Sequence, residues 1–141
     1  MVVEAPAGSR LHVAPLDFTF STGTQFPAEY RGSAFIALHG SWNRSQRIGY
    51  KVAFVPFKDG RPSGPPRDLL TGWMLAPNNR DVWGRPVAVL TLNDGSLLVS
   101  DDGGKKIWRV QPPPSRTPSI AVGKHSGQMP WVNSASEWSV R

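Results

Sequence analysis

The sequence predicts an all-β fold made of short antiparallel strands, and three observations support that class. Apolar runs rich in β-branched and aromatic residues recur along the chain. The chain has 14 glycines and 14 prolines among 141 residues, and only 18% of its residues are charged, a composition that favours tight turns over long helices. No window shows an apolar period of about 3.6 residues flanked by helix caps.

Six segments carry the strand signal, and turn residues separate them. In chain order they are Leu16–Ser21, Ser33–His39, Tyr50–Phe57, Arg85–Leu92, Ser96–Asp101 and Lys106–Val110. The first alternates apolar and polar residues, whereas the second contains the continuous run AFIAL, typical of a strand covered on both faces. Asn93-Asp94-Gly95 predicts a hairpin between the fourth and fifth segments, because these residue types tolerate positive φ.

Two stretches of the chain repeat one plan. GSAFIALHGS and DGSLLVSDDG each contain a turn residue, then an apolar strand, then a polar segment with glycine directly after the strand, which we call the polar exit. Ser33 lies 62 positions before Gly95, and His39 lies 62 positions before Asp101. Repeated strands without helices between them predict blades of about four strands each in a β-propeller. Two hairpins of an ordinary β-sandwich are the alternative.

Length and composition predict one domain with two flanking segments. Residues 1–10 are expected to form an N-terminal arm, residues 11–110 the strand region, and residues 111–141 a tail or arm rich in Pro and Ser. The chain has no cysteine, which excludes disulfides and thiolate metal sites. No segment approaches the roughly 20 apolar residues of a membrane span. The N-terminus has neither the basic start nor the apolar core of a signal peptide.

The formal net charge is +6 and the pI is about 10.3, so nucleic-acid binding has to be considered. Lysine and arginine are scattered, however, and the longest run is Lys105-Lys106. A scattered positive balance is typical of a solvated surface, and it also suits a site for an anionic small molecule. The sequence therefore predicts no nucleic-acid partner.

The predicted strand at residues 33–39 ends in HGSWNR, residues 39–44. A plain turn needs only Gly, Asn or Ser, so a His, a Trp and an Arg at this point indicate a surface that holds a ligand. The alternative is a loop in which Trp42 packs under a strand and Arg44 is solvated.

The second polar exit, SDDGG at residues 100–104, raises the question of a calcium site. Neighbouring strand residues point to opposite faces, so Asp101 and Asp102 are not expected to share one ion. We predict instead that Asp101 accepts backbone N–H bonds in a hairpin turn, and we assign no metal ligand.

Several motifs in combination resemble a known family. They are APL at residues 14–16, FPAEYRG at 26–32, HGSWNR at 39–44, and GRPV followed by LLVSDDGG within 84–104. Between about Leu11 and Val110 the chain resembles the C-terminal part of the pyrroloquinoline-quinone (PQQ)-dependent sugar dehydrogenases. More narrowly, it resembles the L-sorbosone dehydrogenase group, which is related to soluble aldose dehydrogenases. Asp17 departs from the family pattern, which has Gly after APL.

The resemblance implies a six-bladed propeller, of which this chain supplies about two blades. The implied cofactor is PQQ, a tricarboxylate quinone, with calcium in the complete family fold, and the implied reaction is oxidation of an aldose or related sugar. The implied cofactor-binding residues are His39, Trp42, Asn43, Arg44, Arg85 and, as a second choice to His39, His12. The histidine would bind a quinone oxygen or carboxylate, Trp42 would stack on the ring, Asn43 would donate to a carbonyl, and the arginines would bind carboxylates.

The same resemblance places the catalytic base in an earlier blade that this chain does not include. No catalytic residue is therefore assigned, and a single chain is expected to be inactive alone. Two blades would leave strand edges and a core face uncovered. We expect either a homo-oligomer, with a trimer completing six blades, or association with the missing blades. The alternative function is a self-assembling module without catalysis that binds an anionic or carbohydrate ligand. Members of the parent family are periplasmic or secreted.

Overall fold

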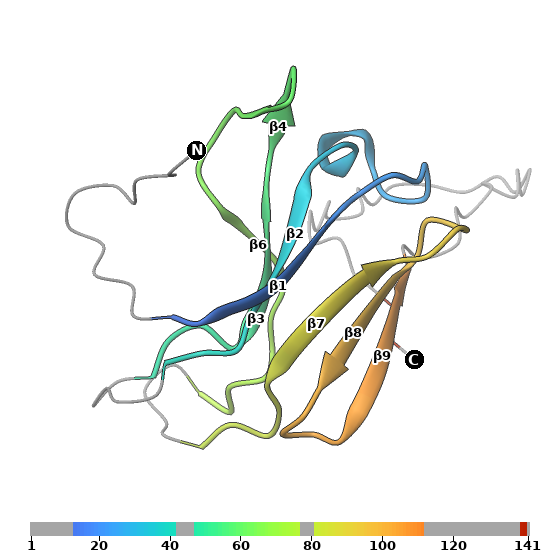
Figure 1. The fold of residues 1–141 in the computed structure, drawn as a ribbon. Helices are drawn as coiled ribbons and strands as arrows, with labels where there is room; N and C mark the ends of the chain where they lie inside the picture. Colours follow the sequence, from blue (N-terminus) through green and yellow to red (C-terminus); the bar gives the residue numbers. More distant parts are fainter. Residues whose placement is uncertain (1–12, 42–46, 77–80, 112–138, 141) are drawn as a thin grey trace, which may run out of the picture.

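The computed structural model describes residues 13–41, 47–76, 81–111 and 139–140, which form two four-stranded antiparallel sheets and one small hairpin (Figure 1). The first sheet has the strand order β1-β2-β3-β6, and the second has the order β10-β9-β8-β7. The elements are β1 Pro15–Phe20, the 3-10 helix η1 Ala28–Tyr30, β2 Ala34–Leu38, β3 Lys51–Val55, β4 Phe57–Lys58, β5 Arg61–Pro62, β6 Arg67–Leu70, β7 Pro86–Thr91, β8 Leu97–Asp101, β9 Lys106–Gln111 and β10 Ser139–Val140. The predicted all-β, antiparallel class is confirmed in these residues.

Each sheet is built from strands that follow one another in the chain. Only the β4–β5 hairpin interrupts the first sheet, between β3 and β6. Strand β2 begins at Ala34 and β8 begins at Leu97, 63 residues later, which is close to the 62-residue spacing of the sequence repeat. The four strands in each sheet match the number predicted for a blade. Among the described residues, no helix is long and apolar enough to cross a membrane.

The core lies between the two sheets. Residues that are directly opposite in antiparallel strands share a face of the sheet, so the pairing register shows which side chains point inward. The inward pairs are Phe35–Phe54 and Ala37–Val52 in the first sheet and Leu97–Val110 in the second, and all six residues are buried. Phe26 and Tyr30, from the β1–β2 connection, extend this core by packing their rings against Phe35 and Phe54. Alternating burial along the strands therefore holds the two sheets together.

The first strands of the two sheets, β1 and β7, lie side by side (Figure 1). Asp17 Oδ2 accepts a hydrogen bond from the Val89 N–H at 3.0 Å, and Thr91 Oγ1 donates to the Phe20 carbonyl at 3.0 Å. The β7–β8 ladder is irregular between Pro86 and Val89, so the Asp17 carboxylate supplies an acceptor where the ladder is interrupted. Asp17, which departs from the family pattern noted above, thus joins the two sheets.

The outer faces of both sheets expose large apolar side chains. On β1 these are Leu16, Phe18 and Phe20, and Phe18 is 61% exposed. On the second sheet they are Leu90 and Ile107, and Ile107 is 69% exposed. Strand β2 was expected to be covered on both faces, but Ile36 and Leu38 on its outer face are only half-buried.

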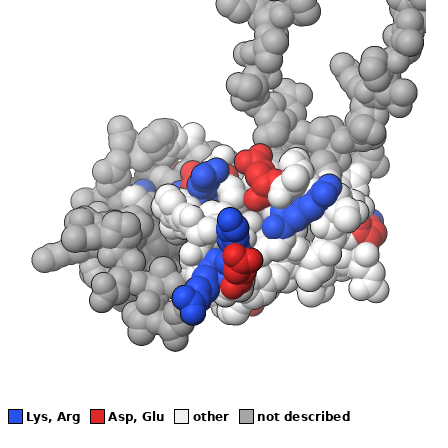
Figure 2. Space-filling view, turned by 90° about the horizontal axis from the view of Figure 1, so that it is seen from above, with Lys and Arg blue, Asp and Glu red and all other residues white. Residues whose placement is uncertain are grey.

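The two ends of the sheets carry different connections. Figure 2 shows the end that carries β4 and η1, seen from above, where basic and acidic side chains lie next to one another. One such pair joins Arg109 and Asp94 beside the β7–β8 turn. The opposite end carries the polar exits that the sequence singles out, and it is described next.

Candidate functional site

Three connections meet at one end of the two sheets, and we call this end the loop edge. It comprises the described parts of the β2–β3 connection (residues 39–41 and 47–50), of the β6–β7 connection (71–76 and 81–85) and of the β8–β9 turn with its flanking residues (101–106). All three lie at the lower end of the molecule in Figure 1. Because β2, β6 and β8 run toward this end, the residues that follow them are brought together there.

Asp101 is the buried centre of the loop edge. The residue is 2% exposed, and its carboxylate accepts four hydrogen bonds. The donors are the Arg85 N–H at 2.7 Å, the Gly104 N–H at 2.7 Å, Trp73 Nε1 at 2.9 Å and Trp108 Nε1 at 3.0 Å. An ionised carboxylate offers about four acceptor sites, so this set accounts for all of them. The prediction that Asp101 accepts backbone N–H bonds is confirmed, and Asp101 has no acceptor site left for a metal ion.

The hydrogen bonds keep Asp101 ionised despite its burial. Burial raises the pKa of the carboxyl group, but the bonds from Gly104, Arg85, Trp108 and Trp73 lower it by more, so the net pKa lies below its ordinary value. The neighbouring glycines make room for this arrangement. A Cβ at Gly104 would lie 2.6 Å from Asp101 Oδ2, and one at Gly84 would lie 2.5 Å from Trp73 Cδ1.

Asp102 points away from Asp101 and connects the two sheets. Its carboxylate oxygens both lie 3.2 Å from His39 Nε2, and its N–H donates to the Arg85 carbonyl at 3.3 Å. The Asp102 side chain is 58% exposed, whereas His39 is 23% exposed. The two predicted ligand-binding residues that the structure describes, His39 and Arg85, therefore lie close together with Asp102 between them.

Tyr50 forms a second buried centre beside Arg85. Its hydroxyl donates to the Ser41 carbonyl at 2.6 Å and accepts from Arg47 Nη1 at 2.8 Å. The guanidinium carbons of Arg47 and Arg85 each lie 6.0 Å from the centre of the Tyr50 ring. Gly40 packs directly against this ring, because a Cβ at Gly40 would lie 2.5 Å from Tyr50 Cε1. Arg85 is a half-buried residue, and its guanidinium group forms no ion pair with any carboxylate in the described part of the chain.

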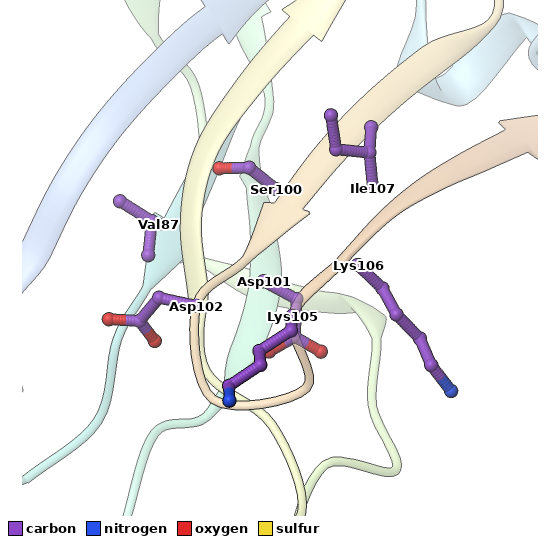
Figure 3. Close-up of a pocket in the computed structure, with 7 residues that line it drawn as sticks. All are labelled: Val87, Ser100, Asp101, Asp102, Lys105, Lys106 and Ile107. Atoms are coloured by element: carbon purple, nitrogen blue, oxygen red, sulfur yellow. The ribbon is translucent and has the colours of Figure 1, made fainter.

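Three tryptophans form a cluster, Trp73 and Trp83 from the loop edge and Trp108 from the adjacent part of β9. Trp73 and Trp83 stack with their centres 6.2 Å apart, and Trp108 meets Trp83 edge-on at 5.5 Å. Lys106 Nζ lies 5.0 Å from the centre of the Trp108 ring, within range of a cation–π contact. A separate open hollow is lined by residues of β7, β8 and the β8–β9 turn, and Figure 3 shows Asp102 next to Val87 there, with the Lys106 side chain extending away from Asp102.

The structure describes the positions of only two of the six predicted binding residues. His39 and Arg85 come together as described, whereas His12, Trp42, Asn43 and Arg44 lie outside the described residues. The sequence analysis missed Arg47, Tyr50 and the tryptophan cluster. Within the described ranges, no three residues of the types His, Cys, Asp or Glu gather closely enough to hold a metal ion. The chemistry available at the loop edge is recognition of an anion by half-buried arginines beside a histidine.

Comparison with known proteins identifies relatives of this arrangement. A family model described as TrAA12-like matches residues 8–113. The chain is 42% identical over 110 residues to an uncharacterised protein of Borreliella burgdorferi, which covers 77% of this chain and 27% of that protein. It is 32% identical over 116 residues to the pyrroloquinoline quinone-dependent pyranose dehydrogenase of Coprinopsis cinerea, covering 71% of this chain and 15% of that protein.

Solved structures give the same result. The holo form of the PQQ domain of the Coprinopsis cinerea pyranose dehydrogenase matches with a TM-score of 0.54 and 33% identity, over 68% of this chain and 26% of that one. The calcium structure of the Trichoderma reesei carbohydrate-active enzyme of family AA12 matches with a TM-score of 0.55 and 31% identity, over 68% of this chain and 24% of that one. The chain thus spans about a quarter or less of the length of these relatives.

These matches correct the narrower resemblance drawn from the motifs. Assignment to the L-sorbosone and soluble aldose dehydrogenase group was wrong, because the matching family model is TrAA12-like and the matching named relatives are a pyranose dehydrogenase and an AA12 enzyme. The combination of FPAEYRG, HGSWNR and GRPV with LLVSDDGG was assigned to the wrong group. The broader relation to PQQ-dependent, carbohydrate-oxidising proteins is retained.

Proposed function

Because the chain belongs to the TrAA12-like family, we propose that its loop edge forms part of the quinone-binding wall of a PQQ-dependent domain that oxidises a pyranose sugar. The chain is part of a domain related to the PQQ-dependent pyranose dehydrogenase and AA12 enzymes. It spans only a fraction of those relatives, so the remaining walls of the site come from elsewhere. A single chain is accordingly expected to bind the cofactor weakly and not to turn over sugar.

One observation carries this proposal: the guanidinium group of the half-buried residue Arg85 lies over Tyr50 without a carboxylate partner among the described residues. A quinone with three carboxylates requires cations on its binding surface, and guanidinium matches carboxylate in a two-bond geometry. His39 lies on the same edge and can donate to a carboxylate or a quinone oxygen. The described residues therefore fit the cofactor, and Arg85 and His39 are the residues that would hold it.

The cofactor, when bound, accepts the electrons of sugar oxidation. This chain's own residues bind and orient it. Arg85 neutralises a carboxylate, and Asp102 orients the His39 ring. We assign no calcium ligand among the described residues, because Asp101 has no free acceptor site.

Replacing Arg85 tests the proposal. Arg85→Ala should weaken the affinity of the chain for PQQ by tenfold or more, since a hydrogen-bonded charged contact contributes about 1.5–3 kcal/mol. Arg61→Ala, on the β4–β5 hairpin at the opposite end, removes the same charge and should leave the affinity within about twofold. Isothermal titration calorimetry with PQQ measures both. Equal affinities for the two variants, or no binding by the unmodified chain, would contradict the proposal.

The fold supports a second proposal, that the two sheets are consecutive blades of a propeller. Their first strands lie side by side, and each sheet turns an apolar outer face away from the other. Exposed apolar side chains such as Phe18 and Ile107 are unfavourable in water and indicate that further sheets pack there. We propose that copies of the chain supply those sheets, so that three copies complete six. The same association would occur in a module that assembles without catalysis.

Solution mass tests this association. Multi-angle light scattering of the unmodified chain should give three times the chain mass, 15.4 kDa, and Phe18→Lys should lower it because a buried charge opposes packing. Lys58→Ala, on the exposed β4 strand, should leave the mass unchanged. A stable monomer at high protein concentration would contradict the association.

A further inference from the structure

We propose that Arg47 is a second anion-binding residue and that Tyr50 positions both Arg47 and Arg85 as a pair. This inference rests on the proposed function, because the anion in question is the carboxylate-bearing quinone. It goes further by assigning a binding residue and a positioning residue that the motifs did not indicate. We call Arg47 and Arg85, with Tyr50 between them, the arginine pair.

The Tyr50 ring is the common support of the two guanidinium groups. Both guanidinium carbons lie 6.0 Å from its centre, so they are separated by no more than twice that distance. Arg47 is also held at the ring's end, because its Nη1 donates to the Tyr50 hydroxyl at 2.8 Å. That bond uses one of the five N–H donors of the guanidinium, so Arg47 keeps others for a ligand.

Tyr50 itself cannot easily move. The residue is 2% exposed, its hydroxyl donates to the Ser41 carbonyl at 2.6 Å, and Gly40 lies against its ring. Its backbone has φ of 52°, in the left-handed region that a tyrosine rarely adopts. Gly49 precedes it with φ of 90° and packs closely against Gly40, since a Cβ there would lie 2.8 Å from the Gly40 Cα. The connection is thus shaped to place one ring at one point.

The positive charges of Arg47 and Arg85 beside the Tyr50 ring favour an anion as the ligand. The negative face of an aromatic ring attracts each guanidinium, which lowers the cost of holding both near each other before a ligand binds. Neither arginine forms an ion pair with a carboxylate of the described residues. A ligand with several carboxylates would relieve the remaining repulsion, and it would bind without first ordering two long side chains. Tyr50 therefore contributes to affinity through the arginines and without touching the ligand.

The first test needs no cofactor. Aromatic rings shift the NMR signals of protons above them, so the side-chain signals of Arg85 should be displaced in the unmodified chain. Tyr50→Phe keeps the ring and should retain the Arg85 displacement, while it frees Arg47 from its hydroxyl partner. Tyr50→Leu removes the ring and should abolish the displacement of the Arg85 signals. Unshifted Arg85 signals in the unmodified chain would overturn the positioning role of Tyr50.

The second test measures PQQ affinity by calorimetry. Arg47→Ala should weaken binding about tenfold. Arg67→Ala is the matched control and should leave PQQ affinity unchanged. Arg67, on β6, also lies beside an aromatic ring, with its guanidinium carbon 5.9 Å from the centre of the Phe54 ring of β3. Tyr50→Leu should weaken binding in the unmodified chain and have little further effect when both arginines are alanine. Tyr50→Phe should lose only the part of the PQQ affinity that depends on Arg47. This variant keeps the test valid if Tyr50→Leu does not fold.

The outcomes separate the two proposals. If the unmodified chain binds PQQ but Arg47→Ala behaves like Arg67→Ala, this inference fails and the proposed function stands. If Tyr50→Leu weakens binding equally with and without the arginines, Tyr50 is a structural residue only. If the unmodified chain does not bind PQQ at all, the proposed function fails and the arginine pair fails with it.

Discussion

Asp101→Ala should lower the free energy of unfolding by roughly 3–5 kcal/mol, the largest loss expected from any single change at the loop edge. The substitution removes the acceptor of four hydrogen bonds and leaves two indole and two backbone N–H groups without a partner in a buried site. Each unsatisfied buried donor costs about 1–3 kcal/mol, although such costs do not simply add. Urea denaturation followed by tryptophan fluorescence measures the loss, and Asp101→Asn gives an intermediate variant if the alanine variant does not fold.

The neighbouring residue provides the control. Asp102→Asn removes an equal charge one position away, where the side chain is 58% exposed and its pair with His39 is screened by water, so it should cost less than about 1 kcal/mol. The pKa of Asp101 in the folded chain is lowered. Its stabilisation should therefore be complete above the ordinary carboxyl pKa of about 3.9 and be lost as the pH falls through the folded-state pKa. Equal losses for Asp101→Asn and Asp102→Asn would contradict the central role of Asp101.

Gly40→Ala should be the second most damaging change, at about 3 kcal/mol. A Cβ at this position would lie 2.5 Å from Tyr50 Cε1, and Gly40 has φ of 105°, which alanine adopts only with strain. The buried ring cannot shift without breaking its bond to the Ser41 carbonyl. Thermal denaturation of the variant should show the loss, and PQQ affinity should fall with it because the arginine pair loses its support.

Gly72→Ala isolates the backbone part of this effect. Gly72 has φ of 112°, close to that of Gly40, but no atom lies within 4 Å of the position its Cβ would take. It should therefore show only the cost of backbone strain, about 1–2 kcal/mol. If both alanine variants lost the same stability, contact with Tyr50 would not be what constrains Gly40.

The strands were the part of the fold most accessible to sequence reasoning. All six predicted segments overlap observed strands, because their apolar alternation reflects which face is buried. Strand β6 was missed because Arg67-Asp68-Leu69-Leu70 is short and follows two prolines. Strands β4 and β5 have two residues each, and except for Phe57, which ends the third predicted segment, they lie in a stretch that reads as a turn. Strand β10 comes from residues 111–141, where the sequence shows no strand pattern.

The sequence pointed to the connections that meet at the loop edge but not to how their side chains are arranged. The repeat placed the HGSWNR and SDDGG exits at equivalent positions, and the structure indeed brings His39 next to Asp102. Arg85 was named only because the family resemblance implies a cofactor-binding arginine there. Tyr50 was read as the start of a strand, because nothing in a linear pattern shows that two arginines from different connections will share its ring. The two Trp donors to Asp101 were missed for the same reason, since Trp73 lies 28 positions away.

The central claim is that the loop edge is the face that contacts the quinone. Chemical-shift mapping of the isotope-labelled, unmodified chain during titration with PQQ tests it most directly. We expect saturable shifts at Gly40, Tyr50, Arg85 and Asp102, with no shifts at the turns of the opposite end around Gly60 and Gly95. Shifts that centre on those opposite turns, or that are spread evenly over both ends of the sheets, would contradict it.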